Sequence, residues 1–261
     1  MQNTNSKKYT SVLIIVQVVL LYGCYMILQS AFDFPDILRK STDEIFALFH
    51  QNRSSIIPTY YGFTLTGVTF ILVSLFSYRA LKKTDRDILF VAAIIGTVCG
   101  LLQAMGYVRW AFLIPVLDNY LHNQALTQSG KESIELILDS FHTYAGVALG
   151  ENLGFVFQGL WTILFSIALF KHQAFQKWIS TIGLICGVGI LIYSLEQFGG
   201  MLSSLGIINI FVQSLWAGWL IVIAAIFYKM DNETETASKP GWISLTIAAI
   251  VFISATVPSL I

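Results

Sequence analysis

Apolar residues fill seven long stretches of the chain, and polar residues gather in the connections between them. Each stretch has about 20 residues or more, the length that an α-helix needs to cross roughly 30 Å of hydrocarbon. The pattern therefore predicts an all-α fold, a polytopic bundle of seven transmembrane helices that forms a single integral membrane domain over residues 1–261. The seven predicted spans are 10–32, 54–78, 88–108, 142–170, 178–198, 205–228 and 242–261.

Composition supports a membrane protein. Hydrophobic residues make up 56% of the chain and charged residues 11%, whereas soluble domains carry about 25% charged residues. The formal net charge is zero, so nothing indicates nucleic acid as a partner. The expected partner is the lipid bilayer. The first span is longer than the apolar core of a secretory signal and is interpreted as a retained helix.

Orientation follows from the lysines and arginines in the connections. Of the 15 such residues, ten lie on the side of the N-terminus, and the densest group runs from Arg79 to Arg86. Cytoplasmic connections carry the excess of positive charge. We therefore expect a cytoplasmic N-terminus and, with seven spans, a C-terminus on the outside.

The two long connections, 33–53 and 118–141, both fall on the outer side. Each contains a candidate for a short amphipathic helix that begins with a capping box. The capping residues are Ser41 with Glu44 in the first, and Ser129 with Glu132 in the second. These helices are expected either to lie on the membrane interface or to cover the bundle.

Glu151 is the most informative residue, because it lies inside the fourth span. A carboxylate near the bilayer centre costs about 2.5–3.5 kcal/mol, so a partner side chain, water or a ligand should face it. Arg109, at the outer end of the third span, is the natural counter-ion. Pro115 follows and is expected to bend or end that helix.

Polar residues are concentrated in the outer halves of several spans. One interpretation is a polar pocket that opens outward and binds a ligand, with Glu196 as a further candidate for its lining. The alternative is structural: an ion pair between Arg109 and Glu151, with interhelical hydrogen bonds from Gln103 and Gln213. A proton or ion path is a third possibility. The candidate ligand-binding residues are Gln103, Arg109, His142, Tyr144, Glu151 and Gln213.

Glycines recur at every fourth position in the fourth span. Gly146, Gly150 and Gly154 form a narrow stripe that His142 and Gln158 flank. Such a stripe allows close approach of another helix. We interpret it as a helix-packing surface, and it could also contact a membrane-protein partner.

The sequence predicts no metal site and no cofactor. Cys24, Cys99 and Cys186 lie in separate apolar spans without a short spacing, which disfavours a disulfide framework or a thiolate site. Among the histidines, His50, His122 and His142 could converge on the outer side. Their spacing matches no zinc motif.

Two segments carry a resemblance to a known family. The first is Gln103-Ala-Met-Gly106 followed by Arg109-Trp110-Ala-Phe112-Leu113 and Pro115. The second runs from Phe141 to Gly154 and contains His142, Tyr144, Gly146, Gly150 and Glu151. Together they resemble the domain-of-unknown-function 4386 family, a set of multi-helix bacterial membrane proteins.

The resemblance implies a bacterial inner-membrane location and makes the third and fourth spans the signature pair. It implies no activity, since none is assigned to the family. In the family a histidine follows the glutamate, where this chain has Asn152. That departure disfavours a catalytic His–Glu pair or a metal centre at this point.

Three functions remain open. The leading one is a membrane protein that binds a small amphiphile or lipid in the outer half of the bundle. The second is an intramembrane hydrolase or transferase, with Glu151 as general base, Arg109 stabilising negative charge and His142 shuttling protons. The third is a scaffold or accessory subunit that uses the glycine stripe. Whether the protein is an enzyme stays undecided, and no catalytic residue is assigned.

Overall fold

The computed structural model describes residues 4–123 and 126–230, and every regular element within them is helical. The predicted seventh span, 242–261, lies outside the described residues. In chain order the elements are α1 (Thr4–Phe32), the 3-10 helix η1 (Asp36–Arg39), α2 (Thr42–Leu81), α3 (Arg86–Asn123), α4 (Gln128–Phe141), the π-helix η2 (His142–Leu153), α5 (Gly154–Phe170), α6 (Lys177–Ser194), the 3-10 helices η3 (Leu195–Phe198) and η4 (Gly200–Leu205), and α7 (Gly206–Lys229).

The all-helical membrane bundle is confirmed. Within the described residues, six helical segments are long and apolar enough to cross a membrane. They coincide with the first six predicted spans. The count of seven spans and the orientation of the termini stay predictions.

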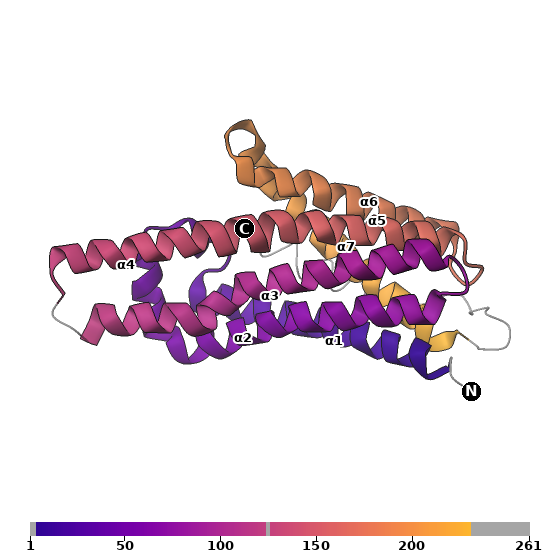
Figure 1. Ribbon diagram of the computed structural model, residues 1–261, viewed down its shortest axis with the longest axis horizontal. Coiled ribbons are helices and arrows are strands. Elements are labelled where there is room, and N and C mark those ends of the chain that lie inside the picture. The colour runs from indigo at the N-terminus through magenta and orange to yellow at the C-terminus, as the bar shows by residue number, and fades with distance from the viewer. Residues whose placement is uncertain (1–3, 124–125, 231–261) are drawn as a thin grey trace.

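The membrane-length helices form a ring in which neighbours in sequence pack side by side. The order is α1, α2, α3, α5, α6 and α7, and α7 closes the ring by packing against α1. Figure 1 shows the bundle from the side. Aromatic side chains fill the interior of the ring. They include Phe70, Trp161, Phe165 and Trp219, each at most 3% exposed.

Several helices continue far beyond the apolar stretches that predicted them. α2 has 40 residues, which at about 1.5 Å per residue is roughly twice the thickness of the hydrocarbon layer. Residues 42–53 are the first part of α2, and α4 continues through η2 into α5 as one rod (Figure 1). The two amphipathic segments are therefore helical, as predicted, but each one continues directly into a membrane-length helix.

The same length corrects the expectation for Pro115. It lies inside α3, which continues to Asn123, so the prolyl residue does not end the helix. Proline removes one backbone hydrogen bond, but the packing of α3 against its neighbours keeps the segment helical.

One capping prediction is confirmed and the other is wrong. Ser41 caps α2, and its hydroxyl accepts from the Glu44 N–H while the Glu44 carboxylate accepts from the Ser41 N–H. The second cap is Thr127, not Ser129. The Thr127 hydroxyl accepts a hydrogen bond of 3.2 Å from the Gly130 N–H, and so the helix begins two residues earlier than expected.

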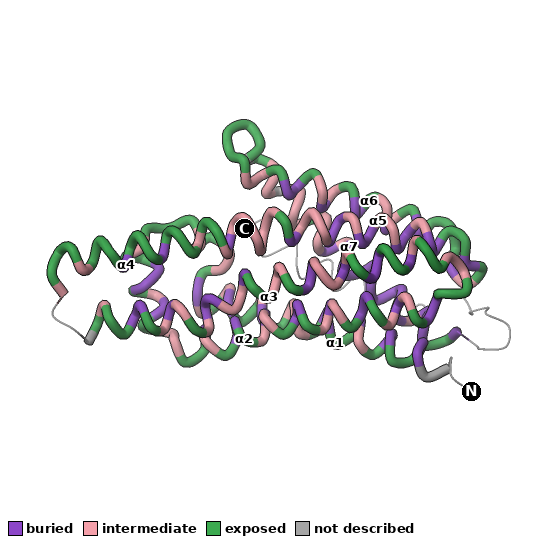
Figure 2. Tube along the Cα trace, viewed as in Figure 1, coloured by how far each residue is buried: buried purple, intermediate pink, exposed green. Residues whose placement is uncertain are grey.

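The extended helix ends form a layer with a core of its own. We call this layer the α4 lobe; it consists of η1, residues 42–53 of α2, residues 109–123 of α3, and α4. Figure 2 shows buried positions that face one another there. The apolar side chains include Phe46, Phe49, Leu117 and Leu138. Their burial explains why amphipathic segments continue the apolar helices.

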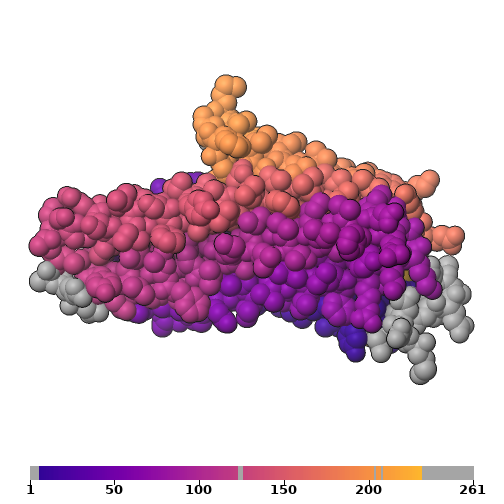
Figure 3. All heavy atoms as spheres, in the orientation of Figure 1, coloured from indigo at the N-terminus to yellow at the C-terminus, as the bar shows by residue number. Residues whose placement is uncertain are grey.

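A second projection stands away from the ring. Residues 195–205, which contain η3 and η4, protrude between α6 and α7 (Figure 3). Gly199 and Gly200 have positive φ angles of 71° and 62°, a conformation that glycine adopts without steric cost. Met201 is 95% exposed at the tip.

Candidate functional site

Glu151 lies in a π-helix rather than an α-helix. Throughout η2 the wider turn, with i→i+5 hydrogen bonds, changes which side chains share a face. Residues seven apart, such as Tyr144, Glu151 and Gln158, would share one face of a helix with about 3.6 residues per turn, but they do not share a face here. Tyr144 is 67% exposed and so lies outside any pocket that Glu151 could line.

The glycine stripe packs against α3 of the same chain. A Cβ atom on Gly150 would lie 3.2 Å from the Cα of Gly106, and one on Gly154 would lie 3.3 Å from Cγ of Gln103. A Cβ on Gly146 would collide with the guanidinium of Arg109. Because these glycines lack side chains, α3 and the Arg109 side chain can pack directly against the backbone of the stripe.

Arg109 is buried beside this stripe, with 8% of its surface exposed. Its guanidinium donates to the backbone oxygen of Gly106 and lies 5.4 Å from the ring centroid of Trp110. The Trp110 ring stacks on Tyr60 at a centroid distance of 4.9 Å. An aromatic layer and a carbonyl oxygen therefore stabilise the positive charge.

Arg109 and Glu151, both described, form no ion pair. Instead, one carboxylate oxygen of Glu151 accepts a hydrogen bond of 2.9 Å from the side-chain amide of Gln197. The two opposite charges still interact electrostatically. Gln197 was not predicted, although it lies next to Glu196 at the end of the fifth span.

Glu196 pairs with a residue that sequence reasoning missed. Its carboxylate lies 3.3 Å from the Arg39 guanidinium, and the glutamate side chain is only 10% exposed. Arg39 ends η1, so this ion pair joins the α1–α2 connection to the α6–α7 connection. Only the tertiary fold could reveal it, because 157 residues separate the partners.

Gln103 and Gln213 each form a hydrogen bond with the side chain of Gln158 rather than with each other. The Gln103 amide donates to Gln158 at 3.4 Å, and the Gln158 amide donates to Gln213 at 3.0 Å. These three residues, the glutamine chain, connect α3, α5 and α7. Hydrogen bonds between helices were one of the two roles expected for Gln103 and Gln213.

Several buried polar atoms near the charges have no hydrogen-bond partner. They are the Tyr60 hydroxyl, His142 Nδ1 and one carboxylate oxygen of Glu196. All three side chains interact electrostatically with Arg109 or Glu151. We call Arg39, Arg109, His142, Glu151 and Glu196 the charged cluster.

Nucleophiles and metal ligands beside Glu151 are the groups that would indicate catalysis at the charged cluster. In the described part of the chain, no serine, cysteine or group of metal ligands forms a hydrogen bond with Glu151. The three cysteines are buried free thiols, and Cys99 donates to the Gly154 oxygen. A cavity of about 150 Å³ lies in the α4 lobe, not at the charged cluster, and its lining includes Asp43, Phe46 and Lys131.

Of the three histidines considered for convergence, two meet. His50 of α2 and His122 of α3 stack with their ring centroids 3.8 Å apart. Asp118, rather than His142, is the third member of that group. Its separation of four residues from His122 on one helix is the signal that sequence reasoning missed.

Comparisons with known proteins give a family without an assigned role. The model of the family described as "Domain of unknown function (DUF4386)" matches residues 10–224. An uncharacterized protein of Archaeoglobus fulgidus is 28% identical over 89 residues. That match covers 34% of this chain and 51% of the archaeal protein, so the chain spans about half the length of this relative. No solved structure matches.

The family match includes both signature segments, residues 103–115 and 141–154, and it covers all or most of each of the six membrane-length helices of the described residues. It covers well over half of the chain. The chain belongs to the domain-of-unknown-function 4386 family.

Proposed function

We propose that the protein is a multi-pass membrane protein that binds a small zwitterionic amphiphile or lipid headgroup at the charged cluster. One observation carries the proposal. Arg109 is buried and Glu151 is half-buried, the two carry opposite charges, and each bonds to a neutral group of the protein rather than to the other.

The energetics favour a third participant. A buried charge requires a partner of opposite charge or several hydrogen bonds. Arg109 could have supplied the first to Glu151, but its guanidinium instead contacts a carbonyl and an aromatic ring. Each charge therefore keeps capacity for a ligand group.

The two charges indicate the class of ligand. An anionic group would pair with the Arg109 guanidinium, which presents planar donors suited to phosphate or carboxylate. A cationic group would pair with Glu151. The unpartnered atoms of Tyr60 and His142 supply hydrogen bonds beside them. The apolar part of the ligand would lie among the acyl chains.

The membrane placement belongs to the same proposal. Lysines and arginines concentrate in the connections at the end of the bundle where α1 begins. We infer that this end is cytoplasmic and that the α4 lobe lies on the opposite, outer side of the membrane. In a bacterial host this membrane would be the inner membrane. The ligand would then enter from the outer leaflet.

Thermal unfolding of the purified full chain in a non-ionic detergent tests the ligand class. Short-chain phosphatidylethanolamine, phosphatidylglycerol and diacylglycerol would be added separately. A ligand that binds the folded state raises the midpoint, and 100 times its Kd adds about 2.7 kcal/mol. We expect the zwitterionic lipid to give the largest rise.

Variants then locate the binding site. Arg109→Gln and Glu151→Gln should each abolish the rise with phosphatidylethanolamine. Glu132→Gln, which removes an exposed carboxylate of α4, should retain it. An equal rise for all three lipids, or a rise that survives in both cluster variants, would refute the proposal. In that case the charges serve packing alone.

A further inference from the structure

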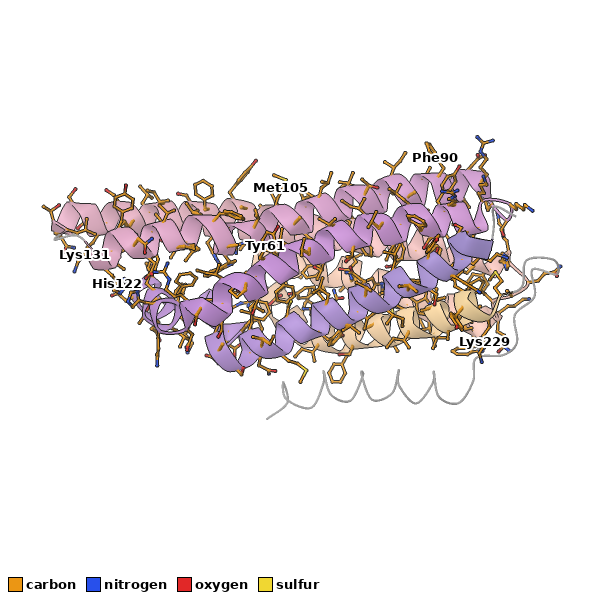
Figure 4. All side chains as sticks on the ribbon, turned by 90° about the horizontal axis from the view of Figure 1, so that it is seen from below. Tyr61, Phe90, Met105, His122, Lys131 and Lys229 are labelled. Atoms are coloured by element: carbon orange, nitrogen blue, oxygen red, sulfur yellow. The ribbon has the colours of Figure 1, made fainter. Side chains whose placement is uncertain are left out.

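The group formed by His50, Asp118 and His122 has the composition and spacing of a metal centre. Two imidazole nitrogens and one carboxylate are a ligand set for divalent first-row ions. The group lies in the α4 lobe and shares no residue with the charged cluster. Figure 4 places His122 at the same end as Lys131 and opposite Lys229.

The donor atoms already lie together. Nδ1 of His50 is 3.1 Å from each carboxylate oxygen of Asp118, and Nδ1 of His122 is 3.0 Å from Oδ1. All the donor atoms lie within 4.8 Å of one another. Around a tetrahedral Zn²⁺, bond lengths of about 2.0–2.2 Å separate neighbouring donors by roughly 3.3 Å. The observed arrangement therefore needs little adjustment.

The backbone explains why these residues meet. Asp118 and His122 are one helical turn apart on α3. His50 comes from α2, where Asn52 interrupts the helical geometry with φ −116° and ψ 18°. This kink, two residues after His50, separates the lobe portion of α2 from its apolar portion.

The stacking of the two imidazoles brings both rings to one carboxylate. The His50 and His122 rings are nearly parallel, with an angle of 14° and centroids 3.8 Å apart. Their Nδ1 atoms lie 3.1 Å and 3.0 Å from the same oxygen, Oδ1 of Asp118. A single divalent ion bound to both Nδ1 atoms would lie between the rings and the carboxylate.

Neighbouring groups compete with the ion and also support it. Arg53 lies 3.4 Å from Oδ2 of Asp118 and donates to Asn119 at 3.0 Å. It therefore orients the carboxylate through Oδ2 and leaves Oδ1, which both histidines share, for the ion. Nδ1 of His122 also lies 3.1 Å from the Asp118 backbone oxygen, a contact that metal binding would replace.

We propose that His50, Asp118 and His122 form a binding site for a divalent transition-metal ion of the Zn²⁺ class. The metal would clamp α2 to α3 in the α4 lobe. Asp118 is fully buried, whereas the side chains of His50 and His122 are 46% and 34% exposed. A fourth coordination position would therefore face solvent, as in zinc sites that keep a bound water.

Metal titration of the full chain in detergent, after removal of bound metal with a chelator, tests the site. Co²⁺ would be added first, because its visible absorption is strong in a tetrahedral protein site and weak for the hydrated ion, and Zn²⁺ would then displace it. We expect one ion per chain and a higher unfolding midpoint with Zn²⁺, but no rise with Mg²⁺, which prefers oxygen ligands.

Variants separate a metal site from a hydrogen-bond network. His50→Gln and His122→Gln change half-exposed side chains and should fold. Loss of a supporting group costs about 10–100-fold in metal affinity, and we expect loss of either ligand to cost at least that. His172→Gln, at the far end of the bundle, should bind the ion as the wild type does. A metal affinity unchanged in both ligand variants, or no Co²⁺ spectrum in the wild type, would overturn the proposal.

Discussion

Gly106 and Gly150 bring α3 and η2 into direct backbone contact. A Cβ atom on Gly106 would lie 2.9 Å from the Cα of Gly150, which is closer than side chains permit. This crossing fixes the distance between the segments that carry Arg109 and Glu151.

We expect Gly150→Ala to destabilise the protein. The added methyl group would meet the backbone of α3, which cannot move aside as a flexible side chain can. Overpacking of this kind costs about 1–3 kcal/mol, and thermal unfolding in detergent would measure it.

Gly23 of α1 supplies the matched control, because nothing lies within 4 Å of a Cβ placed there. Gly23→Ala should be neutral or stabilising by about 0.5–1 kcal/mol, since alanine favours the helix. Equal effects of the two substitutions would contradict the close crossing.

The glutamine chain gives a second prediction. Gln158→Leu should destabilise the bundle, because it leaves the side-chain amides of Gln103 and Gln213 without their shared partner. Hydrogen bonds between membrane helices contribute about 0.6 kcal/mol on average and up to about 1.7.

Replacement of all three glutamines by leucine should cost less than Gln158→Leu alone. An unsatisfied buried amide is more costly than a matched apolar contact. Unfolding midpoints of the single and triple variants would test this order, and the reverse order would show that the hydrogen bonds dominate.

The ion pair between Arg39 and Glu196 gives a third prediction. Arg39→Gln leaves a largely buried carboxylate without its cation, and we expect a loss of about 1–3 kcal/mol. The double variant with Glu196→Gln should recover part of that loss. A double-mutant cycle with zero coupling energy would refute the pairing.

The fourth prediction concerns pH. Lys171 donates a hydrogen bond of 2.6 Å to Asp85, and this contact lowers the pKa of the Asp85 carboxyl below its usual value of 3.8. The contribution to stability is therefore complete above pH 3.8. It disappears as the pH falls through the lower pKa of the folded state.

Unfolding midpoints measured from about pH 6 down to about pH 3 would show this. Wild type should exceed Asp85→Asn at the upper end, and the difference should shrink at the lower end. Glu135→Gln, which removes an exposed carboxylate of α4, should show no such convergence. A constant difference across the range would show that the charge of Asp85 is irrelevant.

The sequence predicted the membrane-length helices well, since bilayer thickness dictates the length of an apolar stretch. It did not predict where helices end. α2 begins at Thr42, twelve residues before its predicted span at 54, because an amphipathic segment can extend the same helix and bury one face in the α4 lobe. The hydropathy of a segment indicates whether it can lie in lipid, but it does not indicate where the helix begins or ends.

The site was less predictable. Glu151 could be identified from the sequence, because a carboxylate within an apolar span carries a high free energy of transfer into lipid. Its partner Gln197 could not, because the contact depends on the position of η3 in the tertiary fold. The π-helix changed the face that each residue of η2 presents, and periodicity calculated for an α-helix could not anticipate that. The pairing of Arg39 with Glu196 likewise requires the tertiary fold.

The rod formed by α4, η2 and α5 runs the length of the molecule, and its middle segment is a π-helix, the kind of interruption at which long helices commonly bend. We therefore expect this rod to bend within η2 rather than within α4 or α5. Tilting of α4 would therefore be taken up around Glu151 before it reached α5, so a movement in the α4 lobe would act first on the segment that carries this acidic residue.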